Sequence, residues 1–287
     1  MPKAAYQMVS ARRAPGVTQK SNLQQTLLRL NRMHLFLSVL HGTTGILLLV
    51  LTDKSATAPI YSFFPDPQTR PGVDDRVGTE WLPVPRKHTA PAIGYFSGVF
   101  LLLASIHHFA VWYPLKNKYE SKVLHNQNPF RWTEYFFSAS FMRLQIALLC
   151  GLFDVHALAL IFGATATTML FGELQEKTNA EKQGSPQEKT FGPFWMGFVP
   201  HTVTWSVILC YFFFGVKHGD PPAFVWAIIF VLMLLDISFA INLYLQQKEI
   251  GRWRQYLFAE LIYCWLSLFA KQSLAWLNFG GAQSLTD

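Results

Sequence analysis

The stretch "LSLFAKQSLAW", Leu266–Trp276, is apolar almost throughout but carries Lys271 near its middle. Ionisable side chains inside a bilayer cost at least ~2.5–3.5 kcal/mol each on insertion scales, so they need a partner or a function. A helix advances about 100° per residue, which places Ser267, Cys264 and Glu260 on the same face as Lys271. A polar stripe therefore runs along this apolar segment and ends at a lysine.

The rest of the chain has the composition of a membrane protein. Of its 287 residues, 51% are hydrophobic and 14% are charged, whereas a soluble domain carries about 25% charged residues. A membrane-spanning helix needs roughly 20 mostly apolar residues. Seven runs meet this need, at about 33–52, 91–113, 131–150, 153–174, 193–215, 222–246 and 254–278. We therefore expect an all-α protein with seven transmembrane helices in one domain, 33–278, between a basic tail, 1–32, and a short tail, 279–287.

The positions of Lys and Arg predict the orientation, because cytoplasmic flanks carry an excess of both. Sixteen lie in the N-terminal tail and in every second link after it, and six lie on the other side. The sequence predicts a cytoplasmic N-terminus and an extracellular C-terminus. The outer loop, 53–90, is rich in Pro, Gly and Asp and is expected to hold a small hairpin. The inner loop, 175–190, is expected to be polar and mobile. The net charge of +7 then belongs to the cytoplasmic face, and no motif indicates nucleic-acid binding.

Several other classes are disfavoured. About 32 residues precede the first run, which is too many for a cleaved signal peptide. The three cysteines suggest neither a disulfide nor a metal site. His107 and His108 point about 100° apart, so they should not face one site, and a single pair is far weaker than the histidine boxes of a membrane di-metal enzyme. No metal is predicted, and His34 is expected to be an interfacial side chain.

The third run carries a second polar stripe. Glu134, Ser138 and Gln145 share a helical face, while Arg143 lies about half a turn round. Glu134 is close to the inner end of this run, so the helix should extend several residues before Arg131 to bring Glu134 level with Lys271. Two interpretations remain open. The pair is a structural ion pair, or the lysine, held in apolar surroundings, is a nucleophilic amine that binds an aldehyde as an imine.

The motifs around both stripes resemble one family. "FAELIYCWLSLFAKQSLAW" (258–276) is similar to the retinal-binding helix of the heliorhodopsins, and "NPFRWTEYFFSASFM" (128–142) resembles their counter-ion helix. "LQEK" (174–177) and "PFW" (193–195) fit the same family. The likeness covers nearly the whole chain. The family has a cytoplasmic N-terminus, as the charge count predicts independently.

This resemblance implies a chromophore and a set of site residues. All-trans retinal would be attached to Lys271 as a protonated Schiff base, with Glu134 as counter-ion and Ser267 and Ser138 near the imine. The resemblance places pocket walls at Met142, Trp205 and Phe239, and a polar proton network at His41, His108 and Glu260. The sequence departs from the family pattern at Arg143, Glu173, Asp236 and His201.

The implied function is light sensing rather than enzymatic catalysis. Light would isomerise the retinal, and the protein would relay a slow conformational signal without pumping ions. The resemblance also implies a homodimer in the bilayer of the cell membrane, with an unidentified cytoplasmic signalling partner. Some viral members of the family are light-gated proton channels, so the extra intramembrane charges keep that alternative open. A ligand receptor coupled to G proteins is disfavoured, because residues 272–287 contain no Lys or Arg.

Overall fold

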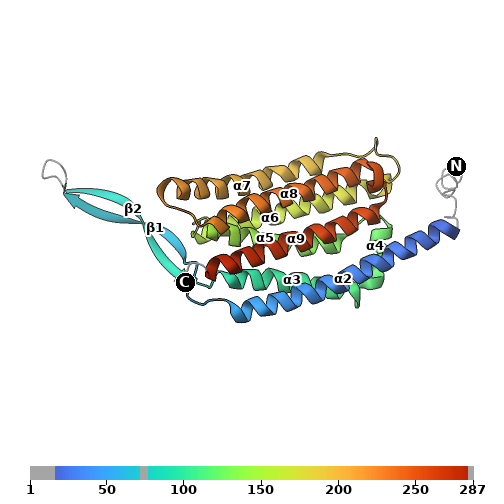
Figure 1. Ribbon diagram of the computed structural model, residues 1–287. Coiled ribbons are helices and arrows are strands. Elements are labelled where there is room, and N and C mark those ends of the chain that lie inside the picture. Colours follow the sequence, from blue (N-terminus) through green and yellow to red (C-terminus); the bar gives the residue numbers. More distant parts are fainter. Residues whose placement is uncertain (1–16, 72–76, 284–287) are drawn as a thin grey trace.

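The computed structural model describes residues 17–71 and 77–283. Seven long helices of the described chain lie side by side in one bundle, and each corresponds to one apolar run (Figure 1). These helices are α2 Val17–Leu51, α3 Gly94–Trp112, α5 Pro129–Leu149, α6 Val155–Asn179, α7 Gly192–His218, α8 Ala223–Lys248 and α9 Tyr256–Gln283. The start of α2 and the end of α9 lie at opposite ends of the bundle, as an odd number of spans requires.

Length and apolarity single out five of these helices as able to cross a membrane: α2 from Asn22 onward, α3, α6 with the turn that follows it, α7 and α8. The other two, α5 and α9, have 21 and 28 residues, which is enough to span at about 1.5 Å per residue. They carry Arg131, Glu134, Arg143, Glu260 and Lys271, whose charges lower their mean hydropathy. Seven membrane spans therefore remain a prediction.

The link between α5 and α6 is as tight as the sequence predicts. Gly151 has a φ of 90°, which glycine adopts without steric cost. Asp154 then caps α6, because its carboxylate accepts a hydrogen bond from the Ala157 amide at 2.7 Å. The two helices consequently pack as an antiparallel pair. A short helix that the sequence did not suggest, α4 (Lys116–Leu124), lies between α3 and α5.

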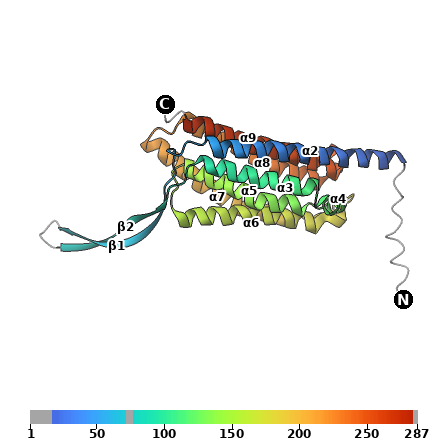
Figure 2. The ribbon, with the colours of Figure 1, turned by 90° about the horizontal axis from the view of Figure 1, so that it is seen from below.

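The outer loop contains the expected hairpin, which is longer than predicted. Strand β1 (Ile60–Pro71) pairs antiparallel with β2 (Val77–Thr89). The two strands project beyond the end of the bundle (Figures 1 and 2). At their base, the Tyr61 amide donates a hydrogen bond to the Phe153 carbonyl at 2.9 Å.

The inner loop, 175–190, contains regular secondary structure. Helix α6 continues to Asn179, and a 3-10 turn, η1, spans Ala180–Lys182. The Asn179 side chain donates to the Thr190 carbonyl and to Gln247 of α8 at 2.8 and 2.9 Å. Lys189 forms a buried ion pair with Glu249 at 2.8 Å. Polar residues of this loop therefore bond one another and the ends of neighbouring helices, and the mobility of the loop stays a prediction.

The two halves of the bundle differ in their interior. Towards the hairpin, the core is mainly apolar, although Ser97, Gln145 and Asn278 are also buried there. Its most buried apolar members include Phe100, Ile208, Phe212, Ile228, Ile229 and Leu274. Towards the start of α2, the interior contains buried charged and polar groups from α5, α6 and α9. The site described next lies where these two halves meet.

Candidate functional site

The two polar stripes meet inside the bundle. Lys271 Nζ of α9 lies 3.2 Å from Glu134 Oε1 of α5, and both side chains are almost completely buried. The lysine donates a hydrogen bond to Ser267 Oγ, one turn earlier on α9, at 2.7 Å. Its Nζ also lies 5.1 Å from the centre of the Tyr135 ring. The lysine, the carboxylate and the serine predicted from the sequence are therefore one cluster.

The predicted inward extension of the third span is not needed for this contact. Helix α5 begins at Pro129, only two residues before Arg131. The Asn128 side chain caps it by accepting a hydrogen bond from the Arg131 amide at 3.0 Å. Glu134 nevertheless reaches Lys271, because its Oε1 lies 3.2 Å from the lysine nitrogen. The depth mismatch inferred from span boundaries was wrong.

A largely apolar cavity opens from the lysine. It has a volume of about 140 Å³, whereas one water needs roughly 10–15 Å³ on this scale. The cavity is sized for an organic molecule rather than for one or two waters. Its lining includes Tyr135, Met142, Gly172, Phe194, Phe198 and Phe239. Met142 and Phe239 are thus walls, as predicted. Gly172 leaves room for the indole of Trp132, because a Cβ at this position would overlap that ring.

A second, smaller cavity of about 20 Å³ lies on the other side of the ion pair. Its lining is polar and includes His34, His108, Arg131, Glu134, Glu260 and Ser267. Lys271 lines only the apolar cavity and Glu134 only the polar one, while Tyr135 and Tyr263 line both. The Lys271–Glu134 pair therefore marks the border between an apolar and a polar compartment.

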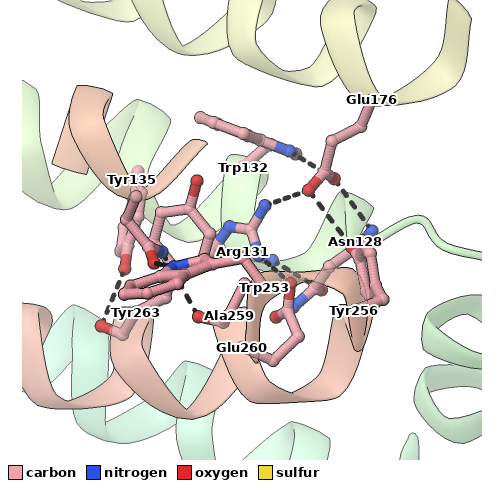
Figure 3. Close-up of polar contacts among 11 residues, drawn as sticks. Asn128, Arg131, Trp132, Tyr135, Glu176, Trp253, Tyr256, Ala259, Glu260 and Tyr263 are labelled. Atoms are coloured by element: carbon pink, nitrogen blue, oxygen red, sulfur yellow. Dashed lines mark hydrogen bonds and ion pairs between the residues drawn. The ribbon is translucent and has the colours of Figure 1, made fainter. Parts of the chain in front are cut away.

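An arginine network closes the polar side (Figure 3). Arg131 of α5 donates hydrogen bonds to Glu176 of α6 and Glu260 of α9 in two buried ion pairs. Its guanidinium carbon lies 3.8 Å from the centre of the Tyr263 ring. Asn128 donates to both carboxylates, through its amide to Glu176 at 3.1 Å and through its side chain to Glu260 at 2.6 Å.

Further donors saturate Glu176 in this network. Trp132 Nε1 and Tyr256 Oη donate to it at 2.7 and 3.1 Å. Glu260 was predicted to belong to a proton network with the histidines, but its bonds are to Arg131 and Asn128. In the sequence, Arg131 contributed only to the count of Lys and Arg on the inner side, and Glu176 appeared only within the "LQEK" motif. The spacing of these two residues along the chain did not indicate that they would meet.

The histidines form a buried group, which corrects two predictions. His34 is 4% exposed and its Nδ1 lies 2.9 Å from Nδ1 of His108, so it is not an interfacial side chain. His107 and His108 both line the small polar cavity, although adjacent residues were expected to face different sites. The close packing of α2 on α3 brings His34 and His41 onto the ring of His108. His41 also contacts Gln272 of α9 at 3.1 Å.

The remaining predicted residues fall into different surroundings. Ser138 is fully buried and its hydroxyl has no hydrogen-bond partner in the described chain. Gln145 bonds Ser97 of α3 at 2.8 Å instead of facing the lysine. Trp205 is buried but does not line either cavity in the described part of the chain. It lies against Arg143, and its Nε1 donates to Asp236 at 3.0 Å. No group of three or more potential metal ligands occurs among residues 17–71 and 77–283.

Comparisons with known proteins identify the family and the fold. The heliorhodopsin family model matches residues 30–283, which is most of the chain. Among solved structures, the rhodopsin of Exiguobacterium sibiricum is 14% identical, with a TM-score of 0.55 over 90% of this chain and 97% of its own. Xanthorhodopsin, a light-driven ion pump with dual chromophore, is 10% identical, with a TM-score of 0.61 over 91% of this chain and 94% of its own.

A thermophilic rhodopsin is similar to the same extent, at 14% identity and a TM-score of 0.59 over 91% of this chain and 94% of its own. These likenesses show a rhodopsin fold. A search of curated proteins finds no match. The chain belongs to the heliorhodopsin family. It is an integral membrane protein of rhodopsin type, and its family implies a retinal chromophore and a light-dependent function.

The arginine network predicts a large effect on stability. Arg131→Met leaves Glu176 and Glu260 buried without their shared cation, and breaking a buried ion pair from one side costs about 3–5 kcal/mol. We expect a loss of this size in unfolding measurements in detergent. Lys116→Met is the matched control, because it breaks an exposed pair with Glu120 at 3.7 Å, worth about 0.5 kcal/mol or less. Equal stability of the two variants would contradict the assignment.

Proposed function

We propose that the protein is a light sensor in which Lys271 binds all-trans retinal as a protonated Schiff base and Glu134 is its counter-ion. The observation that carries this proposal is the buried Lys271–Glu134 pair at 3.2 Å, placed where the apolar cavity begins. An amine in such a position is the group that binds an aldehyde covalently. The same observation argues against a purely structural ion pair, because a structural pair does not require an adjoining cavity.

The residues around the lysine fit this chromophore. The cavity walls are mostly aromatic and aliphatic, as a polyene requires. Ser138 Oγ has no hydrogen-bond partner in the described chain. Glu134 Oε1 already lies 3.2 Å from the Lys271 nitrogen, so its carboxylate can balance the charge of an imine, which has one N–H in place of the ammonium's three. Ser267, which already accepts from the Lys271 ammonium, is positioned next to the same nitrogen.

The bound retinal supplies light absorption and isomerisation, and the protein supplies the electrostatics and the shape. Glu134 holds a negative charge beside the Lys271 nitrogen, so any movement of that nitrogen changes a strong interaction in a low dielectric. Met142 and Phe239 hold the cavity walls, and the apolar lining excludes water. Each of these groups lies on α5, α8 or α9, so a change at the lysine acts directly on three helices.

The arginine network supports a relay towards the inner end of the bundle. Arg131 lies one turn before Glu134 on α5, and Glu260 lies three turns before Lys271 on α9. The two helices are thus joined by two buried ion pairs, one at the candidate chromophore site and one nearer the end of the bundle. A shift of α9 relative to α5 at the first pair must also strain the second. We propose that the second pair, Arg131–Glu260, passes the signal to a cytoplasmic partner.

Orientation and assembly belong to the same proposal. The excess of Lys and Arg beside the start of α2 supports a cytoplasmic location for that end, with the hairpin outside. Family membership supports seven spans in the cell membrane and a homodimer.

The apolar half of the bundle supports a sensor over the alternative, a light-gated proton channel. Beyond the cavity, Ile208, Ile228 and Leu274 are packed without exposed surface, and the buried polar residues Gln145 and Ser97 bond each other. A proton path needs a continuous series of polar groups or water. We expect no photocurrent above background in whole-cell recordings of illuminated cells. Lys271→Ala cells are the matched control. A reproducible current that depends on Lys271 would show a channel or a pump instead.

Removing the lysine tests the chromophore site. Purified wild-type protein mixed with all-trans retinal should develop a visible absorption band, and light with hydroxylamine should bleach it. Lys271→Ala should give no band, because no other amine opens into the apolar cavity among residues 17–71 and 77–283. Lys177→Ala, at an exposed lysine paired with Glu173, should bind as the wild type does. A full band in Lys271→Ala would overturn the assignment.

Neutralising the carboxylate tests the counter-ion. Glu134→Gln removes the charge that stabilises the protonated imine, so the band should move to longer wavelength, or the imine should lose its proton at neutral pH and absorb in the near ultraviolet. Glu134→Asp keeps the charge and should retain a visible band. An unchanged spectrum in Glu134→Gln across pH 5–9 would assign the counter-ion elsewhere.

A further inference from the structure

The cavity that opens from Lys271 contains a second ion pair, which the proposed function does not use. Arg143 of α5 donates to Asp236 of α8, and both residues line the cavity. Trp205 of α7 fixes the pair from behind. Its indole nitrogen donates to the same carboxylate oxygen at 3.0 Å, and its ring centre lies 4.3 Å from the guanidinium carbon. Three helices therefore hold a cation and an anion in a fixed orientation.

This pair lies on a different part of the cavity wall from the lysine. Arg143 is nine residues beyond Glu134 on α5, which is about 13.5 Å along the axis and half a turn round. It therefore faces α7 and α8, whereas Glu134 faces α9. The other ionisable side chains on the cavity lining in the described chain are Lys271, His201 of α7 and the phenols of Tyr135 and Tyr263. A charge here acts on the bound molecule away from its attached end.

We propose that the Arg143–Asp236 pair sets the wavelength at which the pigment absorbs. This inference rests on the proposed function. When retinal bound as a protonated imine absorbs light, positive charge moves from the imine nitrogen along the polyene. An anion near the receiving part stabilises the excited state and shifts absorption to longer wavelength, and a cation does the reverse. The fixed pair places both signs side by side, so their fields largely cancel, and loss of one residue leaves the field of the other.

Two variants and one control test this inference in reconstituted, purified protein. Asp236→Asn leaves the guanidinium uncompensated, so the band should move to shorter wavelength, by on the order of 10 nm for one unit charge a few ångström from the polyene. The double variant Arg143→Gln with Asp236→Asn removes both charges and should return the band close to that of the wild type. Glu173→Gln removes a carboxylate of α6 that pairs with Lys177 and does not line the cavity, so it should leave the band unmoved.

The outcomes separate this inference from the proposed function. No visible band in the wild type would overturn both. A wild-type band that does not move in Asp236→Asn, or that moves equally in the single and double variants, would overturn only the role of the pair. If Asp236→Asn does not fold, the variant Arg143→Gln tests the role of the pair instead. It leaves the Asp236 carboxylate without its cation, and a shift to longer wavelength is expected. Absence of that shift would end the inference.

Discussion

The structure depends on one constraint, which is that a charge inside an apolar bundle must be compensated by another charge. Lys271 is buried in α9, and only the carboxylate of Glu134 lies close enough to balance it among the described residues. The same rule accounts for Arg131 between Glu176 and Glu260, and for Arg143 against Asp236. Each pair joins two different helices. The pairs therefore fix the rotation of each helix about its own axis. In this orientation Lys271 lines the cavity.

The distribution of these pairs divides the molecule by function. Towards the start of α2, buried polar groups form a connected set from the histidines to the arginine network. Towards the hairpin, Phe100, Ile229 and Leu274 belong to a mainly apolar core, in which Gln145 and Ser97 are buried polar residues that bond each other. A change in charge at the border between these halves is screened little on either side, because both surroundings are buried.

The fold alone does not separate a light sensor from an ion pump. Xanthorhodopsin is a light-driven ion pump, and its chain superposes on this one with a TM-score of 0.61 at 10% identity. Function in such a fold is decided by the side chains of the site. In this protein the relevant side chains are the carboxylate beside the lysine, the apolar core beyond the cavity, and the charge pair on the cavity wall. The last of these, Arg143 and Asp236, is also where the sequence departs from the family pattern.

The sequence by itself determined the seven apolar helices, the hairpin and the polar stripe that carries Ser267 and Lys271. These follow from local rules, because bilayer thickness sets the length of an apolar run and helical periodicity places Ser267 and Lys271 on one face. Only the tertiary structure decided which buried charges would meet. Arg131, Glu176 and Glu260 lie on three different helices, and His34 of α2 contacts His108 of α3. Whether such residues meet depends on how each helix is rotated and on its depth in the bundle. Helix rotation and depth are set by packing between helices. The periodicity within one helix does not predict that packing.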